Sequence, residues 1–189
     1  MRRGFKSEAE RAALAARVAV KVAPGSPLDP WAYPKHLGIV ILDFESLSLS
    51  SATRKQLLEV DYESWSAMTI KENGIDVIIV NPRHARTRQC TNLMHEIAHI
   101  ELGHVPARVE VSKITGLLLL SDYSDEQELE ADWRAAAMLL PRDALVGHRK
   151  RRKSVSDIAE HFCLSEQLVE WRIRMTGVDV QIRRAGNYP

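Results

Sequence analysis

Two histidines and a glutamate occur at the spacing from which an α-helix can build a metal site. His95, Glu96 and His99 form the motif H-E-x-x-H. Residues four apart lie on the same face of a helix, so His95 and His99 can direct two imidazoles toward one ion. Glu96 lies on the flank of that face, within reach of a water molecule that the ion activates. The pattern indicates hydrolysis at a zinc ion, with His95 and His99 as ligands and Glu96 as the general base.

The residues around this motif indicate a buried helix. A chance occurrence of H-E-x-x-H would be expected on a solvated helix with polar neighbours. Here the neighbouring positions are apolar, namely Leu93, Met94, Ile97, Ala98 and Leu102. Buried histidine and glutamate side chains without partners would cost free energy, and a bound metal removes that cost.

A catalytic zinc usually takes three protein ligands, so one more residue is needed. In the metzincin pattern the third ligand would be a histidine at position 105, preceded by a glycine at position 102. Val105 and Leu102 occupy these positions, which excludes that pattern. His104 lies one place early and is a candidate for a structural role or for a donor to the oxyanion.

The acidic stretch at 124–133 offers the third ligand. Glu126, Glu128 and Glu130 compete for the role, and we favour Glu128. Glu128 and Asp132 are four apart, so Glu128 can bind zinc while Asp132 accepts a hydrogen bond from a ligand histidine, as in gluzincins. Two alternatives stay open: Glu130 is the ligand, or Glu128 only closes a capping box with Asp125.

Composition is that of an ordinary soluble globular protein. The chain has 189 residues, of which 45% are apolar and 27% charged, and its net charge is +1. That charge provides no overall attraction to nucleic acid or membranes. Cys90 and Cys163 are far apart in sequence and are expected to be free thiols. Arg17 and Lys21 interrupt the Ala/Val-rich stretch at 12–23, so we expect neither a signal peptide nor a membrane span, and a cytoplasmic location.

The expected fold class is α+β, mainly helical with a small β-sheet. Strands are predicted at 39–42, 67–71 and 75–80, and helices at 7–22, 29–37, 50–60, 82–103, 124–140, 141–147, 154–162 and 165–176. Asn73-Gly74 predicts a tight hairpin turn between the last two strands. The strand at 75–80 is expected to form a sheet edge along which a peptide substrate adds as a further strand. Residues 105–121 and the tail after Gly177 give no regular pattern.

Two units are expected along the chain. Residues 1–147 would form a zincin-like metallopeptidase domain, and residues 148–189 a basic linker, a helix-turn-helix-like module and a tail. The basic run at 148–153 is typical of a solvated linker, with nucleic-acid contact as the alternative.

Three blocks of the sequence resemble the ImmA/IrrE metallopeptidases. The first is HEIAHIELGH at 95–104, and the second is ELEADWRAAAMLLP at 128–141, which is similar to the family block E-x-x-A-N-x-F-A-x-x-L-L-M-P. The third, at 158–177, is similar to the family's C-terminal helical module. Departures are Asp132 at the place of the usual asparagine, Arg134 at the place of an aromatic residue, and no aromatic residue in the segment RTRQCT at 86–91.

The resemblance implies a zinc metallopeptidase with His95, His99 and Glu128 as ligands. Its substrate would be a repressor with a helix-turn-helix (XRE-type) domain, cleaved to relieve repression. Manganese also suits two histidines and one carboxylate. Tyr123, His104 and Arg134 are candidates for donors to the oxyanion.

Two other functions stay open. The helix-turn-helix-like segment next to the basic run fits a DNA-binding regulator. The zinc could also only stabilise a non-catalytic interaction protein, although such a site would not need Glu96 beside the metal.

Overall fold

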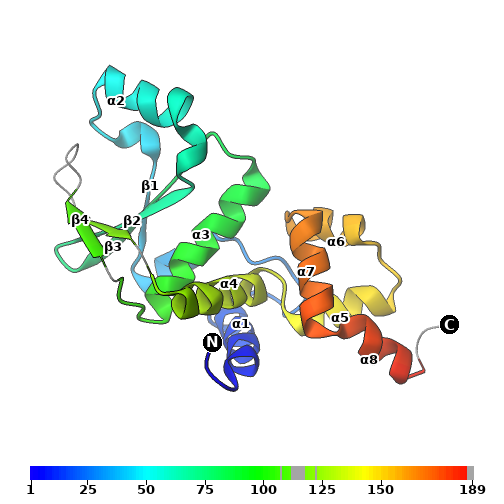
Figure 1. Cartoon of the computed structure of the whole chain (residues 1–189). Coiled ribbons are helices and arrows are strands. Elements are labelled where there is room, and N and C mark those ends of the chain that lie inside the picture. The colour runs from blue at the N-terminus through cyan, green and yellow to red at the C-terminus, as the bar shows by residue number, and fades with distance from the viewer. Residues whose placement is uncertain (107, 112–117, 122, 187–189) are drawn as a thin grey trace.

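The computed structural model describes residues 1–106, 108–111, 118–121 and 123–186, and it shows an α+β chain (Figure 1). The α-helices are α1 (Phe5–Ala19), α2 (Ser51–Lys55), α3 (Arg86–Glu101), α4 (Asp125–Leu139), α5 (Arg142–Lys150), α6 (Val155–Phe162), α7 (Glu166–Thr176) and α8 (Val178–Arg184). The strands are β1 (Val40–Leu42), β2 (Ala67–Glu72), β3 (Ile75–Val80), β4 (Arg108–Val111) and β5 (Leu118–Ser121). Short 3₁₀ turns occupy Tyr33–Leu37, Phe44–Ser46 and Tyr62–Ser64, and a π turn occupies Gln56–Val60.

In the described part of the chain the strands form one sheet in the order β1-β3-β2-β5-β4. β2 and β3 form the expected antiparallel hairpin, in which Asn73 and Gly74 adopt positive φ angles of 50° and 83°. β3 pairs on its other side with β1, in parallel. The prediction that 75–80 is a sheet edge is therefore wrong, because β3 has a neighbour on each side. The irregular structure predicted for 105–121 is also wrong for the described residues, which contain β4 and β5.

Alternation along the hairpin sends its side chains to two different cores. Ile78 and Val80 of β3 belong to the main core with α3, whereas Ile79 joins Phe44 and Ile70 in a second cluster on the opposite face. Thr69 precedes Ile70 on β2, so it points to the α3 side, where it is buried. Thr69 thus presents a polar side chain from the sheet to the helix that carries H-E-x-x-H.

The main core lies between the sheet and a layer of helices. α4 packs against both α1 and α3, and Figure 1 shows α4 crossing below α3. Small buried residues on the three helices, including Ala13, Ala98 and Ala131, allow the backbones to approach closely. Because α3 and α4 are in direct contact, side chains at facing positions of the two helices can act on one ion.

Helices α5–α8 form a module beside α4, and buried arginine contacts join it to the rest. The Arg172 side chain of α7 is 0% exposed, donates to the Leu140 carbonyl at 3.0 Å, and pairs with Glu10 of α1 at 2.6 Å. Helix α8 follows Gly177, in the tail for which no regular pattern is predicted. Helix α5 continues to Lys150 and so includes half of the expected basic linker.

Several element boundaries differ from the predictions for local reasons. α3 begins at Arg86, because the Asn81 side chain accepts from Arg83 N and donates to two loop carbonyls instead of capping a helix. α1 begins at Phe5, after Gly4, which adopts the left-handed conformation. Of the segment 29–37 only the 3₁₀ turn is helical. No helix among the described residues has the length and apolar character needed to cross a membrane.

Candidate metal centre

The two histidines of the motif lie together on α3. The Nε2 atoms of His95 and His99 are 2.9 Å apart, as expected for residues one turn apart on one face. His99 is 1% exposed, whereas the His95 side chain is 21% exposed. The pair therefore has a buried member and a partly exposed member.

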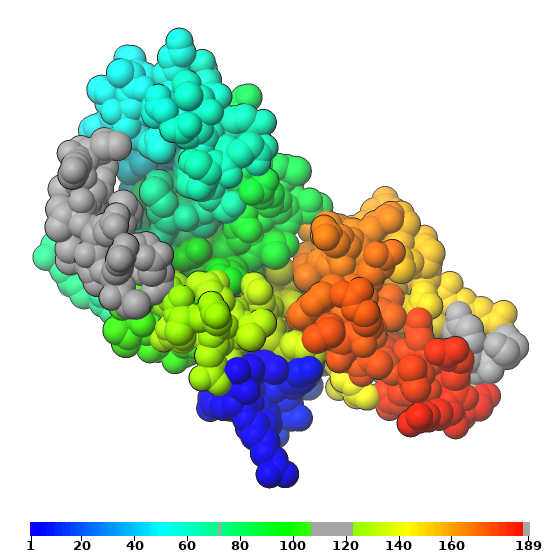
Figure 2. All heavy atoms as spheres, viewed as in Figure 1, coloured from blue at the N-terminus to red at the C-terminus, as the bar shows by residue number. Residues whose placement is uncertain are grey.

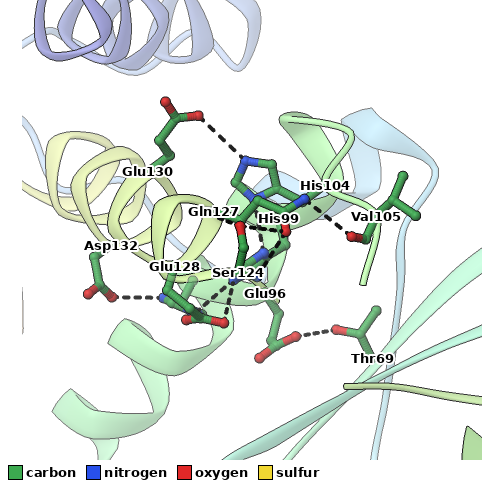
Figure 3. Close-up of polar contacts among 11 residues, drawn as sticks. Thr69, Glu96, His99, His104, Val105, Ser124, Gln127, Glu128, Glu130 and Asp132 are labelled. Carbon is green, nitrogen blue, oxygen red and sulfur yellow. Dashed lines mark hydrogen bonds and ion pairs between the residues drawn. The ribbon is translucent and has the colours of Figure 1, made fainter. Parts of the chain in front are cut away.

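Glu128 reaches both histidines from α4, and Figure 3 shows it close to Asp132 on that helix and to Ser124 at its start. Its Oε2 lies 3.1 Å from His95 Nε2, and its Oε1 lies 3.7 Å from His99 Nε2. The helix start leaves Glu128 free for this contact, because Ser124 and Gln127 form the capping box. The alternative in which Glu128 caps the helix with Asp125 is therefore wrong.

The three side chains fit a divalent metal ion. Their ligand atoms all lie within 4.8 Å of one another. Ligands at the Zn–N and Zn–O distances of tetrahedral zinc lie roughly 3.3 Å from each other. The separations of 2.9, 3.1 and 3.7 Å are of that size. Two imidazoles and one carboxylate are also a ligand set that leaves a coordination position open to solvent or substrate.

Charges and burial act differently on the two imidazoles. Burial lowers the pKa of His99 to about 3, helped by the neighbouring His95 and His104, so its ring is neutral and can serve as a ligand at neutral pH. Burial also favours neutral His95, but the hydrogen bond with Asp132 and the charges of Glu96, Asp132 and Glu128 outweigh it. The pKa of His95 is therefore raised.

Glu96 is held by the sheet. The Thr69 hydroxyl on β2 donates a hydrogen bond to Glu96 Oε2. Burial raises the pKa of the Glu96 carboxyl, and the hydrogen bond from Thr69 acts in the opposite direction. The hydrogen bond from Thr69 to one oxygen thus fixes the orientation of the carboxylate. Burial moves its pKa upward, toward the range of a base that works near neutral pH.

Each histidine also has an outer partner. His95 Nδ1 lies 3.0 Å from Asp132 Oδ1, the arrangement expected for Asp132. His99 Nδ1 lies 3.0 Å from His104 Nδ1, and His104 Nε2 lies 3.7 Å from Glu130 Oε2. Partners of this kind fix which ring nitrogen carries the proton and how the ring is turned.

Glu130 therefore occupies a different place from Glu128. It is 8% exposed, accepts a hydrogen bond from the Arg2 backbone N–H at 3.0 Å and faces His104. Glu126, the third competitor, pairs with the amino group of Met1 at 2.8 Å. Of the three glutamates, Glu128 alone joins the two histidines in the described structure.

The candidate oxyanion donors lie in three different environments. The Tyr123 ring stacks on His99 with centroids 3.7 Å apart, and burial together with the charges of Glu96 and Glu128 raises its pKa to about 12. Tyr123 is therefore protonated and can donate. His104 is turned toward His99, and Arg134 binds Glu101 through two nitrogens at 2.9 and 3.1 Å.

The sequence reasoning missed two contacts of this site. Motif spacing does not identify Thr69, although a threonine between Met68 and Ile70 in a strand is a polar residue that points to one of two apolar cores. The pairing of His99 with His104 was also missed. It depends on the turn after α3, where Gly103 has a φ angle of 63°.

Comparison with known proteins gives one family match. Residues 52–174, well over half of the chain, match the family model Peptidase M78, described as an IrrE N-terminal-like domain. No curated protein matches the chain. A solved structure of a Mycobacterium tuberculosis transcriptional regulator is similar at 12% sequence identity and a TM-score of 0.47. The match covers 89% of this chain and 46% of that one, so the chain spans about half of the length of that regulator.

Proposed function

The chain belongs to the peptidase M78 family, and from this premise we propose that it is a zinc-dependent endopeptidase with His95, His99 and Glu128 as the metal ligands. The observation that carries the proposal is the convergence of Glu128 from α4 on the two imidazoles of α3. Glu96 stands next to the first ligand in sequence. A site that served stability alone would not require that carboxylate, so this arrangement supports catalysis over a purely structural metal.

Each group of the site has a distinct task in peptide hydrolysis. A zinc ion bound there would supply a Lewis acid for the substrate carbonyl and make water a stronger acid. The hydrogen bond from Thr69 occupies Glu96 Oε2, so Oε1 is the oxygen that accepts a proton from the attacking water. Glu96 then delivers this proton to the leaving amine. We favour the Tyr123 hydroxyl as the donor for the developing oxyanion, because its ring stacks on the ligand His99, whereas His104 and Arg134 are engaged elsewhere.

The proposed substrate is a transcriptional repressor with a helix-turn-helix domain of the XRE type. The resemblance of the blocks at 95–104, 128–141 and 158–177 to ImmA/IrrE metallopeptidases supports this choice. Cleavage would relieve repression. Manganese could replace zinc, because two histidines and one carboxylate bind both ions.

Direct DNA binding by the C-terminal module is less well supported. Arg149 of the basic run pairs with Asp179 through contacts of 2.9 and 3.0 Å. Arg172 of α7 is buried and binds Glu10, so it is not available to phosphates. These two arginines stabilise the packing of α5–α8 with one another and with α1. This favours a structural role for the module over DNA binding.

Metal analysis tests the ligand set. Plasma mass spectrometry on the wild type, Glu128→Ala and Glu130→Ala, each loaded with zinc and desalted, should give about one zinc per chain except in Glu128→Ala. The Glu130 variant is the matched control, because it removes a carboxylate two residues away on the same helix. A wild type that binds no zinc, or zinc lost only from Glu130→Ala, would contradict the ligand assignment.

Cleavage of a panel of purified XRE-type repressors tests the reaction and the substrate. Glu96→Gln should keep its zinc and lose cleavage, since the amide cannot accept the proton. Full activity of Glu96→Gln would remove Glu96 as the general base. Cleavage of unrelated proteins but of no repressor would leave the peptidase and refute the proposed substrate.

A further inference from the structure

An apolar cavity of about 360 Å³ adjoins the candidate metal centre between α4 and α7. His95 and Asp132 line it together with apolar side chains of both helices. In Figure 2 the yellow-green surface of α4 lies next to the orange surface of α7. The volume of the cavity falls within the range of pockets that bind small ligands, about 300–1,000 Å³.

The apolar lining is incompletely covered by the protein itself. Leu129 is 57% exposed and Met175 is 40% exposed, although both are large apolar residues. Leu168 and Trp171 are half-buried, and Trp171 stands edge-to-face against the buried Trp133 with ring centroids 5.3 Å apart. Apolar side chains gathered around one hollow and left open to water are typical of a binding site.

The charged groups of the lining are already engaged. Asp132 is bound to His95 Nδ1 at 3.0 Å, and the Lys6 ammonium lies 4.1 Å from the centre of the Trp133 ring. An incoming charged group would lose hydration and would have to displace one of these contacts. An apolar side chain would bury the exposed lining without that cost.

We propose that this cavity binds a large apolar side chain of the substrate, next to the peptide bond that is cleaved. The inference rests on the proposed peptidase function. His95 belongs both to the metal cluster and to the cavity wall, so a peptide bound at the cluster can place a side chain from beside the cleaved bond in the cavity. The substrate class is therefore a peptide with leucine, methionine or an aromatic residue beside that bond.

The tryptophans of the chain allow a test that needs neither metal nor activity. The protein has four, of which Trp133 and Trp171 line the cavity, while Trp31 and Trp65 lie elsewhere. We would label metal-free protein with 5-fluorotryptophan, assign the ¹⁹F resonances with single Trp→Phe variants, and titrate N-acetyl-phenylalaninamide. The resonances of Trp133 and Trp171 should shift saturably, and N-acetyl-glycinamide should shift none. No shift, or equal shifts of all four resonances, would overturn the inference.

Peptide-library cleavage tests the role of the cavity in specificity. The zinc-loaded wild type should enrich large apolar residues at one position beside the cleaved bond. Met175→Lys should lower kcat/KM for those peptides about tenfold and weaken the preference, with zinc content unchanged. Val180→Lys is the matched control, because Val180 is an exposed apolar residue of α8, 44% exposed, outside the cavity lining.

The outcomes separate the two proposals. Cleavage without an apolar preference would overturn the role of the cavity and leave the peptidase in place. If no peptide is cleaved, the proposed peptidase function is overturned. The fluorine titration then shows separately whether the cavity binds an apolar side chain.

Discussion

Replacing His104 with phenylalanine should lower the zinc affinity of the protein, although His104 is not placed as a ligand. When His99 binds an ion through Nε2, its proton must reside on Nδ1, which lies 3.0 Å from His104 Nδ1. In the metal-free protein His99 can carry its proton on either nitrogen. The loss of the acceptor at position 104 therefore destabilises only the metal-bound state.

The size of the effect follows from burial. His99 is 1% exposed, so water cannot replace the missing acceptor. A buried donor without a partner costs about 1–3 kcal/mol, which corresponds to a loss of affinity of about 5- to 150-fold. Asp132 makes a contact of the same length with His95, but its side chain is 63% exposed. Water can replace that carboxylate, so Asp132→Ala should cost less than about tenfold.

Competition with a chromophoric zinc chelator measures the affinities directly. His104→Phe should bind more weakly than Asp132→Ala, and His104→Asn, which restores an acceptor, should recover much of the affinity. His36→Phe at an exposed position is the matched control. Thermal unfolding of the metal-free proteins would identify a variant that is merely misfolded. Wild-type affinity in His104→Phe, or a larger loss in Asp132→Ala, would refute the reasoning from burial.

Three further predictions concern the base, the proton balance and the packing. In steady-state assays, Thr69→Val should lower kcat about tenfold with little change in KM, because Glu96 loses one charge-assisted hydrogen bond. Thr69→Ser keeps the hydroxyl and should restore kcat. The pKa of His95 is raised, so protons compete with zinc for this ligand below that pKa. Zinc affinity should fall about tenfold for each unit by which the pH is lowered below the pKa of His95, and it should be constant above that pKa. A pH series of chelator titrations measures this, and affinity that rises on acidification would contradict it. Glu10→Ala should lower the free energy of unfolding by about 3 kcal/mol in urea titrations, because it leaves the buried Arg172 charge unpaired. An unchanged urea midpoint would contradict the role of this ion pair.

Interactions within one helix or hairpin could be predicted from local spacing, whereas contacts between distant segments could be predicted only where the acidic stretch at 124–133 matched a known ligand pattern. The spacing of His95 and His99 fixes their common face whatever surrounds them, and the hairpin followed from Asn73-Gly74. The contact between Thr69 and Glu96 depends on which face of the sheet meets α3, and that face is the one whose residues Ile78 and Val80 join the main core. Strand β5 joins the sheet through the pair Ile70–Leu119, a long-range contact with no local signal.

The choice between Glu128 and Glu130 shows how the fold resolves an ambiguity that spacing leaves. Residues two apart on a helix differ by about 200° in direction, so only one of the two carboxylates can face the α3 histidines. Glu130 is buried and has its oxygens at the Arg2 amide and at His104, so binding a metal would require it to give up both contacts. The Glu128 side chain is 44% exposed and already lies at both imidazoles. Removal of Glu130 should therefore act on the metal only through His104, and it should weaken zinc binding less than removal of Glu128 does.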